Sequence, residues 1–409
     1  NAQDSDKEVK QKVIDKKGKP TLIIFKDKSK LSANDSKKLF KEQLKLDEHS
    51  KFSNVKSESD KSGFSHKKYQ QYYDGVKVEF ATYSLHSKGD HLESMSGEYY
   101  NIEGVETTPS LSKDVAFKKA LQHIGAKSYL WEDPESAAKI GYVKPEGELV
   151  LLPALEDQED SKKKSKEEAR LAYKFDIYAT SPVSRGDLYI DAKNGRALFY
   201  NATIKHLGKF SHSSNSAENK NVSSPSAAKS MLATASAATR YSGTQSIQTA
   251  VSGSSYILSD ATRGNGIQTY NMRKGTNYNN AVNFTDSDNN WTAAEYNNTY
   301  KDNGALDAHW GAEKTYDYWS SVHGRNSFDN QGAAIKSYVH FDVGYDNAYW
   351  NGSVMTYGDG SGTYFDVLTS IDVAAHEIGH AVCEKTANLA YQKESGAMNE
   401  AFSDIWGAS

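Results

Sequence analysis

The sequence of 409 residues has one cysteine and no long apolar run. Because Cys383 is the only thiol, the chain can form no internal disulfide. No stretch approaches the ~20 apolar residues that a membrane-spanning helix needs. The net charge of −4 is too small to indicate nucleic-acid binding, and the lysines alternate with Asp and Glu instead of forming a basic stripe. These absences predict a soluble protein with no membrane span and no nucleic-acid partner.

Methionine is missing from position 1, where the chain has Asn in a polar segment. This start is typical of a protein whose secretion signal has been removed or is not included. We therefore expect a secreted, extracellular protein.

Lysine is unevenly distributed, with 35 residues before position 221 and 7 after it. The later half is instead rich in Asn, Tyr, Gly and Ser, and such a break favours separate units. Residues 206–239, between the two parts, are mostly Ser, Ala, Asn and Lys without periodicity. This composition predicts an exposed linker that is open to cleavage.

The part before this linker has mixed α and β signals. Alternating apolar and polar positions predict strands, and a serine-capped run predicts a helix. Asn194-Gly195 lies between two strand-like runs and predicts a hairpin. The predicted strands are 21–25, 76–83, 171–178, 186–190 and one that begins at Ala197; the predicted helix is 112–121, and a charged loop is predicted at 157–169.

The residues with the clearest chemical meaning are His376-Glu377-Ile378-Gly379-His380. On a helix, positions i and i+4 share one face, so His376 and His380 can direct two imidazole nitrogens at one ion. Glu377 points off this line and can reach a metal-bound water without ligating the metal, which is the position of a general base. The simpler alternative is a solvated amphipathic helix that happens to carry two histidines.

A second motif, from Gly396 to Asp404, supports the metal interpretation. Catalytic zinc takes three protein ligands, and a pair of histidines with one glutamate is a recognised set, so Glu400 is the candidate third ligand. Asp404 follows four residues later on the same helix face and could accept the second N–H of a ligand histidine. Cys383 shares the face of His376 and His380, and we interpret it as a core residue because free cysteine is commonly a small buried hydrophobe.

With these motifs, the chain from Tyr338 to Asp404 resembles the thermolysin-like neutral metalloproteases almost continuously. The similarity includes Val339-His340, residues 344–352, Met355, residues 357–360, residues 371–373 and Tyr391-Gln392. A weaker similarity reaches back to about Arg240 and includes residues 260–264 and Asp307-Ala308-His309.

The resemblance implies roles for the site residues. His376, His380 and Glu400 would bind zinc, Glu377 would activate the water, and Asp404 would orient His376. Asn399 would support His380, and Tyr391 would stabilise the oxyanion. Asn347 and the backbone carbonyl of Ala348 would hold the substrate main chain as an extended strand. Without the resemblance, Tyr391 is interpreted as a core residue and Asn347 as part of a turn.

Calcium is the second ion that the resemblance implies. Asp286, Asp288 and Asn290 place oxygen side chains at alternate positions, which suits a hard cation. From composition alone an ordinary polar loop is the better interpretation, because the terminal glutamate of a full calcium loop is absent. The family has a loop calcium here, and Asp372 corresponds to a family calcium ligand whose partners lie further along the chain.

The resemblance further implies that a largely helical half, which completes the catalytic domain, follows the zinc-binding half. Nothing after Glu400 is long enough to supply it. We therefore expect a C-terminally truncated chain with zinc and base but only half a cleft.

Upstream, the chain resembles the propeptide of the same family. Residues 66–76 resemble its first module and residues 173–200 its second, PepSY-like module. The expected fold class is α+β, with a two-module α+β propeptide before the β-rich N-terminal half of the catalytic domain. The expected domains are 1–105 and 106–205 for the propeptide modules, 206–239 for the linker with a processing site between about Ser223 and Arg240, and 240–409 for the catalytic half.

These observations predict the precursor of a secreted, zinc-dependent neutral endopeptidase, with Glu377 as general base and a zinc-activated water. Its propeptide would assist folding and inhibit the catalytic domain. We expect a monomer that binds Zn²⁺ and Ca²⁺ and acts on proteins or peptides. Two alternatives stay open: a zinc aminopeptidase of the same HExxH-plus-Glu class, for which no acidic anchor motif is seen, and an inactive truncated product that acts only as a propeptide inhibitor or chaperone.

Overall fold

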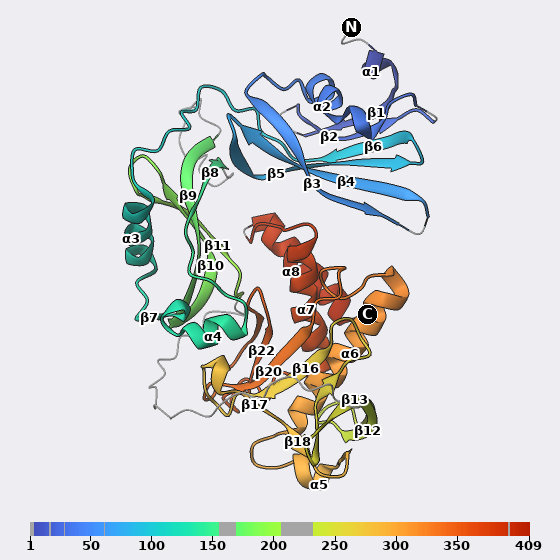
Figure 1. The fold of residues 1–409 in the computed structure, drawn as a ribbon, viewed down its shortest axis with the longest axis vertical. Coiled ribbons are helices and arrows are strands. Elements are labelled where there is room, and N and C mark those ends of the chain that lie inside the picture. The colour runs from blue at the N-terminus through green and yellow to red at the C-terminus, as the bar shows by residue number, and fades with distance from the viewer. Residues whose placement is uncertain are drawn as a thin grey trace. The chain divides into compact units, whose positions relative to one another are not determined.

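The computed structural model describes residues 4–15, 18–27, 29–60, 62–154, 169–205, 232–391 and 393–409. These residues belong to two compact units (Figure 1). Unit 1 draws on residues 1–124, 146–175 and 188–200, and unit 2 on residues 125–145, 176–187 and 201–409. The division differs from the predicted domains, because residues 125–145 and 176–187, expected in the second propeptide module, belong to the unit of the zinc motifs. The predicted domain boundaries stay a prediction.

Unit 1 is mostly antiparallel sheet. Its strands pair in the order β1-β2-β6-β5-β8-β9-β10-β11, with β3 beside β4 and β4 beside β5. The strands are β1 (Val9–Ile14), β2 (Pro20–Phe25), β3 (Ser50–Ser59), β4 (Phe64–Tyr73), β5 (Val76–Lys88), β6 (His91–Gly97) and β8 (Glu148–Pro153), with β9 (Ala169–Ser181), β10 (Val183–Asp191) and β11 (Ala197–Ala202), which extend into unit 2. The helices are α1 (Asp4–Lys7), the 3-10 turn η1 (Ala33–Asp35), α2 (Ser36–Leu44) and α3 (Lys113–Ile124).

The core of unit 1 follows from strand alternation. Ala81, Tyr83 and Leu85 occupy every second position of β5 and are fully buried, because successive side chains point to opposite faces of a sheet. Leu39 and Phe40 of α2 pack in one hydrophobic cluster with Tyr83 and Leu85.

The secondary structure predicted for this region is confirmed. The helix α3 begins directly after Ser112, whose hydroxyl accepts a hydrogen bond from Val115 N at 3.4 Å. The five predicted strands correspond to β2, β5, β9, β10 and β11. The predicted charged loop at 157–169 lies outside the described residues except for Ala169, which begins β9.

The predicted linker at 206–239 is wrong at its C-terminal end. Leu232–Ala238 forms strand β12, which pairs with β13 (Thr244–Ser252) in antiparallel register. Ala235 and Ala237 are its buried positions, and alanine alternating with Ser and Thr gives a weak period-two signal. Residues 206–231 lie outside the described part.

Unit 2 contains two sheets and the helices that carry the zinc motifs (Figure 1). One sheet has the order β18-β14-β13-β12-β19, and the other has the order β15-β16-β20-β22-β21 with β17 beside β16. The strands are β14 (Ser255–Ile257), β15 (Ser259–Asp260), β16 (Ile267–Asn271), β17 (Val282–Asn283), β18 (Thr285–Asp286), β19 (Asn290–Trp291), β20 (Ile335–Phe341), β21 (Ala348–Trp350) and β22 (Met355–Gly358), with β7 (Ser128–Tyr129) paired to β9. The helices are η2 (Leu130–Glu132), α4 (Pro134–Lys139), η4 (Tyr278–Asn280), α5 (Ala293–Tyr296), α6 (Asn303–His323), α7 (Ile371–Lys385) and α8 (Lys393–Gly407).

Small residues let the three long helices of unit 2 approach closely. A Cβ added to Gly311 of α6 would lie 3.1 Å from the Cβ of Ala374 on α7, and one added to Gly379 of α7 would lie 3.1 Å from the Cα of Ser403 on α8. Such contacts are tighter than ordinary van der Waals packing, so both positions favour glycine. The close packing fixes α7 between α6 and α8.

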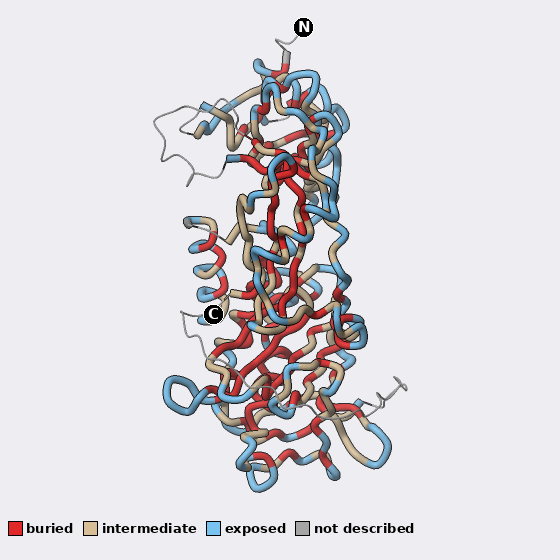
Figure 2. The backbone as a smooth tube through the Cα atoms, turned by 90° about the vertical axis from the view of Figure 1, so that its left-hand side faces the viewer, coloured by how far each residue is buried: buried red, intermediate tan, exposed pale blue. Residues whose placement is uncertain are grey.

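Burial follows the strands, and many of the connecting turns are exposed (Figure 2). β22 is buried along its whole length, and β20 at all but one position. Within the described residues, no helix combines the length and the apolar character that crossing a membrane requires.

Candidate metal centre

Helix α7 brings the two motif histidines together. Their ring centroids are 4.6 Å apart and the rings are perpendicular. Glu400 of α8 completes the group, with its Oε2 at 3.3 Å from His376 Nε2 and at 3.5 Å from His380 Nε2. One ligand atom from each residue lies within 4.8 Å of the other two. The structure thus places the three predicted zinc ligands at one point, and Gly379 contributes by letting α8 approach α7.

The outer nitrogens of both histidines are held by neighbouring side chains. Nδ1 of His376 lies 2.9 Å from Asp404 Oδ1, and Nδ1 of His380 lies 2.8 Å from Asn399 Oδ1 and 3.0 Å from Ser403 Oγ. With the proton on Nδ1, the Nε2 lone pairs are left for a metal. Asp404 and Asn399 lie where their predicted roles require, and the buried Ser403 is an additional partner that the sequence analysis missed.

The charges of the site suit a cation. Burial acts to raise the pKa of Glu400, but hydrogen bonds from His376 and His380 outweigh it and lower this pKa overall. Burial acts to lower the pKa of His376, whereas Glu400, Glu377 and Asp404 together raise it. Two imidazole nitrogens and one ionised carboxylate form a donor set that fits Zn²⁺ with a position left for water.

Glu377 is buried beside this group and is held by backbone. Its Oε2 accepts a hydrogen bond of 2.8 Å from the N–H of Trp350 on β21. The indole Nε1 of Trp350 donates to Glu384 Oε2 at 2.7 Å. Glu384 lies seven residues after Glu377, on the same face of α7, so helical spacing could have suggested that both residues face one partner.

The predicted substrate-binding residues lie on and before strand β21. This strand forms one end of its sheet's described pairing order, where it pairs with β22. Asn347 precedes it and Ala348 begins it, and both residues are buried. An edge strand next to the candidate base is where an extended peptide could add as a further strand.

Residues 201–205, also in unit 2, contact these predicted substrate-binding and catalytic residues. Asn347 Nδ2 donates to the backbone carbonyl of Lys205 at 3.5 Å. Tyr391 N donates to Asn201 Oδ1 at 2.7 Å, and the ammonium of Lys205 lies 5.2 Å from the centre of the Tyr391 ring. The same ammonium donates to Asn399 Oδ1 at 3.4 Å. No local sequence signal connects position 205 with these residues.

Lys205 and Tyr391 both interact electrostatically with Glu400, one of the three candidate zinc ligands. Burial lowers the pKa of Lys205, and Glu400 is the strongest of the acidic groups that oppose this effect. Burial, together with the interaction with Glu400, raises the pKa of Tyr391. Tyr391, which sequence alone would assign to a core, therefore interacts with Glu400, and its role at the oxyanion stays a prediction.

The candidate calcium residues form local turns. Asp286 Oδ2 accepts hydrogen bonds from the backbone N–H groups of Asp288 and Asn290, both at 3.1 Å. Asp288 Oδ1 also accepts from Asn290 N at 2.9 Å. Asp372 lies exposed in the first turn of α7. Among the described residues, the only group of three or more histidine, cysteine or acidic side chains with converging ligand atoms is the one at His376, His380 and Glu400, so calcium binding stays a prediction.

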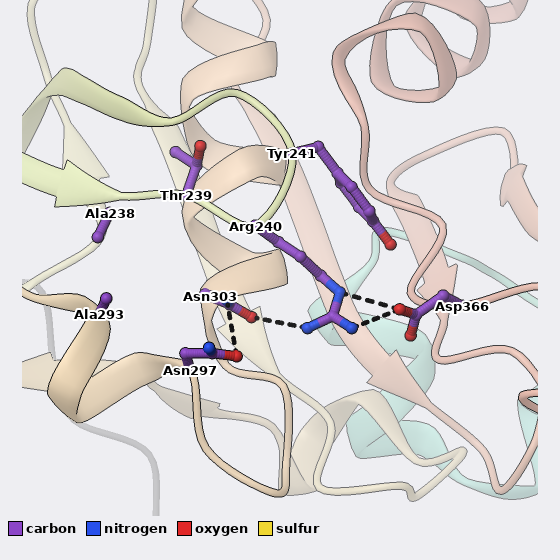
Figure 3. A pocket seen from close by; sticks show the side chains of 8 residues that line it. All are labelled: Ala238, Thr239, Arg240, Tyr241, Ala293, Asn297, Asn303 and Asp366. Carbon is purple, nitrogen blue, oxygen red and sulfur yellow. Dashed lines mark hydrogen bonds and ion pairs between the residues drawn. The ribbon is translucent and has the colours of Figure 1, made fainter.

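Two further features of unit 2 lie outside the predicted catalytic chemistry. Cys383 is a free, buried cysteine, as expected of a core residue. A polar pocket of about 380 Å³ is lined by Ala238, Thr239, Arg240, Tyr241, Ala293, Asn297, Asn303 and Asp366 (Figure 3). The guanidinium of Arg240 binds Asp366, with Nε donating to Oδ2 at 3.1 Å, so the positive charge in this pocket is neutralised within it.

Three known family models match successive parts of the chain. The thermolysin metallopeptidase catalytic domain matches residues 234–384, and the thermolysin metallopeptidase alpha-helical domain matches residues 387–409. The fungalysin/thermolysin propeptide motif matches residues 50–99. The catalytic match begins within β12, which agrees with the corrected end of the linker.

Individual relatives extend this similarity over most of the chain. A bacillolysin from Brevibacillus brevis is 33% identical over 354 residues, covering 84% of this chain and 56% of the relative. The thermostable neutral protease NprT from Geobacillus stearothermophilus is 35% identical over 359 residues, covering 86% of this chain and 59% of the relative. Among solved structures, the precursor of protealysin from Serratia proteamaculans is 33% identical over 34% of this chain and 41% of its own, with a TM-score of 0.30. The chain thus spans a little over half the length of these two sequence relatives, and it belongs to the thermolysin-like metallopeptidase precursors.

Proposed function

We propose that the chain is part of the precursor of a secreted, zinc-dependent neutral endopeptidase, in which Glu377 is the general base. The observation that carries this proposal is the convergence of His376, His380 and Glu400 beside a buried Glu377 that faces an edge strand. Secretion, a monomeric state and calcium at Asp286, Asp288, Asn290 and Asp372 rest on the family resemblance.

The substrate would bind as an extended strand along β21. The side chain of Asn347 and the carbonyl of Ala348 would hold its main chain, because strand addition joins backbone groups and is independent of most side chains. This arrangement would place a peptide bond next to Glu377, whose carboxylate is already oriented by Trp350 N. Pre-orientation of the base reduces the entropy lost on reaching the transition state.

Bound zinc would polarise the scissile carbonyl and lower the pKa of a water. Glu377 would take a proton from that water as it attacks and would then deliver it to the departing amine. The hydroxyl of Tyr391 would donate a hydrogen bond to the oxyanion. The Nδ1–H groups of His376 and His380 would donate to Asp404 and Asn399 throughout the reaction. Their Nε2 atoms would therefore stay available as ligands.

Replacing Glu377 with Gln tests this role. The Glu377→Gln variant should keep stoichiometric zinc but lose casein hydrolysis and self-processing when it is made in the complete gene product. Cleavage of an N-terminally blocked peptide by the parent would separate an endopeptidase from an aminopeptidase. Full activity in Glu377→Gln would end the assignment of Glu377 as base.

We also propose that residues 201–205 inhibit the catalytic unit by occupying the substrate path. The carbonyl of Lys205 accepts a hydrogen bond from Asn347, the side chain proposed to hold the substrate main chain. The Lys205 ammonium approaches Asn399 and the ring of Tyr391, and Asn201 binds the backbone of Tyr391. A peptide substrate and this segment would therefore compete for the same groups.

A lysine substitution tests the inhibitory contact. Lys205→Ala in the complete precursor should shorten the lag before activity appears, because the ammonium loses its contacts with Asn399 and Tyr391. Lys118→Ala, at an exposed lysine of α3, serves as the matched control and should leave the lag unchanged. Equal lags in Lys205→Ala, Lys118→Ala and the parent would refute the role of this contact.

A further inference from the structure

Two hydrogen bonds join helix α7 to Trp350, the last residue of strand β21. Glu377 accepts one of them from the backbone N–H of Trp350 at 2.8 Å, and Glu384 accepts the other from the indole Nε1–H at 2.7 Å. Glu384 follows Glu377 by two helical turns, or about 10 Å along the axis of α7. One residue of the edge strand is therefore attached to the helix at two separate points.

The pairing of β21 with β22 does not hold the backbone N–H of Trp350. The hydrogen bonds of this hairpin include Gly358 N to Asn347 O at 3.0 Å and Asn351 N to Val354 O at 3.1 Å. Successive residues of an antiparallel strand direct their N–H and C=O groups to opposite sides. Because Asn351 donates toward the β22 side, the N–H of Trp350 points to the other edge of β21, where Glu377 accepts it.

The indole ring connects this N–H with Glu384. Trp350 is 2% exposed, and its ring packs against that of Phe328 with centroids 5.1 Å apart. Apolar packing is non-directional, whereas a hydrogen bond to a carboxylate is charge-assisted and depends on the donor angle. Nε1–H is the only donor of an indole, so its bond to Glu384 selects one orientation of the ring. A fixed ring restricts rotation of the Trp350 backbone and hence the direction of its N–H.

We propose that Glu384 is a positioning residue for peptide cleavage, which acts through Trp350 to orient Glu377. This role rests on the proposed function of Glu377 as general base. A base must lie within about 2.6–3.2 Å of the proton that it takes, and a misplacement of about 1 Å can cost about a hundredfold in rate. Loss of the indole bond should therefore affect the rate of the bound complex more than substrate binding, which is proposed to occur at Asn347 and Ala348.

The charge of Glu384 is balanced outside the core. Its second oxygen, Oε1, lies 2.6 Å from the ammonium of Lys385, which leaves Oε2 for the indole. The two side chains are 30% and 38% exposed, so substitution of either one leaves no desolvated charge behind. Both positions can therefore be changed without the penalty of an unpaired buried ion.

Steady-state kinetics of the complete gene product test the proposal, with an N-terminally blocked peptide at saturating zinc. Glu384→Ala should lower kcat about tenfold. Its KM and its zinc affinity should stay within about twofold of the parent values, because only an interaction that matters in the transition state is lost. Glu384→Gln keeps a carbonyl oxygen as acceptor and should recover most of the rate. Lys385→Ala, which leaves the indole bond intact, is the matched control and should keep the parent kcat.

A double-mutant cycle assigns the effect to the indole bond. Trp350→Phe removes the indole N–H but keeps the ring face and the backbone donor, and it should lower kcat about as much as Glu384→Ala does. The variant that carries both substitutions should be no slower than the slower single variant, because both changes remove the same interaction. Losses that multiply in the double variant would overturn the proposal, since Glu384 would then act without Trp350.

Two other results would also decide against it. Parent-like kcat in Glu384→Ala, while Glu377→Gln is inactive, would refute the role of Glu384 and leave the base assignment intact; activity in Glu377→Gln would instead end that assignment. A raised KM and a lowered thermal stability in Glu384→Ala, with no recovery in Glu384→Gln, would show that Glu384 only supports the fold of β21.

Discussion

Glu313 makes the stability of unit 2 depend on pH in a direction that is unusual for a carboxylate. It lies on α6 with 1% of its surface exposed, and burial raises its pKa from 4.5 to about 7. Gln248 N donates to its Oε1 at 2.8 Å, and Arg263 lies 3.7 Å away, but neither offsets the desolvation. The folded protein therefore holds a proton at pH 5–7 that the unfolded chain releases.

The sign and size of the change in unfolding free energy with pH follow from this difference in bound protons. Because the folded pKa is raised, the stabilisation is complete below the unfolded pKa of about 4.5 and is lost as pH rises through about 7. Between pH 5 and pH 8 this one group should lower the free energy of unfolding by about 2.5 kcal/mol. His309, at 3.5 Å from Glu313, stays neutral in the folded protein in this range, because burial lowers its pKa to about 4. Its protonation in the unfolded chain has the opposite effect on stability, and this contribution is common to the parent and to a Glu313 variant, so it cancels in their difference.

Glu313→Gln isolates the effect. The amide oxygen can still accept from Gln248 N but carries no charge at any pH. Urea unfolding of the parent and the variant at pH 5 and pH 8, each in excess zinc, gives the difference in their pH dependence. We expect the variant to match the parent at pH 5 and to exceed its stability by about 2 kcal/mol at pH 8. Parallel changes in the two proteins would show that Glu313 is not protonated in the fold.

Two further substitutions test the metal centre and strand β22, which pairs with the edge strand β21. Asp404→Asn should weaken zinc binding about 10- to 100-fold in competition with a chelator, because His376 loses the carboxylate that orients it. Glu394→Gln, at an exposed residue of the same helix, is the control and should leave the zinc affinity unchanged. Equal zinc affinities of the two variants would contradict the role of Asp404. Gly358→Ala should destabilise unit 2 by about 1–3 kcal/mol in urea unfolding, because the new Cβ would lie 2.1 Å from the carbonyl oxygen of Tyr345. An unchanged unfolding midpoint would show that β22 can shift at no cost in free energy.

The ligand group could be predicted from sequence because its geometry is local. Positions i and i+4 of one helix set the distance between His376 and His380, and the same spacing relates Glu400 to Asp404. Only the packing of α7 against α8 depends on the tertiary structure. That packing depends on Gly379, whose missing side chain leaves room for Ser403 and Trp406, a requirement that the five-residue motif does not reveal by itself.

The other site contacts join segments that are distant in sequence. Glu377 is held by the backbone N–H of Trp350, and a backbone donor has no residue signature. Lys205 reaches Asn347 and Asn399 across 142 and 194 positions, where neither periodicity nor capping gives information. The β12 strand was missed for another reason, since its inward residues are alanines, which barely differ in hydrophobic contrast from the Ser and Thr between them.

The base and the metal ligands are oriented by different elements, which has a measurable consequence. Helix α8 holds the outer nitrogens of the histidines, whereas β21 holds Glu377, and β21 in turn pairs with β22. A change in β22 such as Gly358→Ala should therefore reduce peptide cleavage by the complete enzyme at unchanged zinc affinity. Asp404→Asn should reduce zinc affinity and should recover most of its cleavage rate at saturating zinc. If both variants lost zinc affinity and saturated rate together, the two supports would be mechanically coupled, and α8 and β21 would not orient the ligands and the base independently.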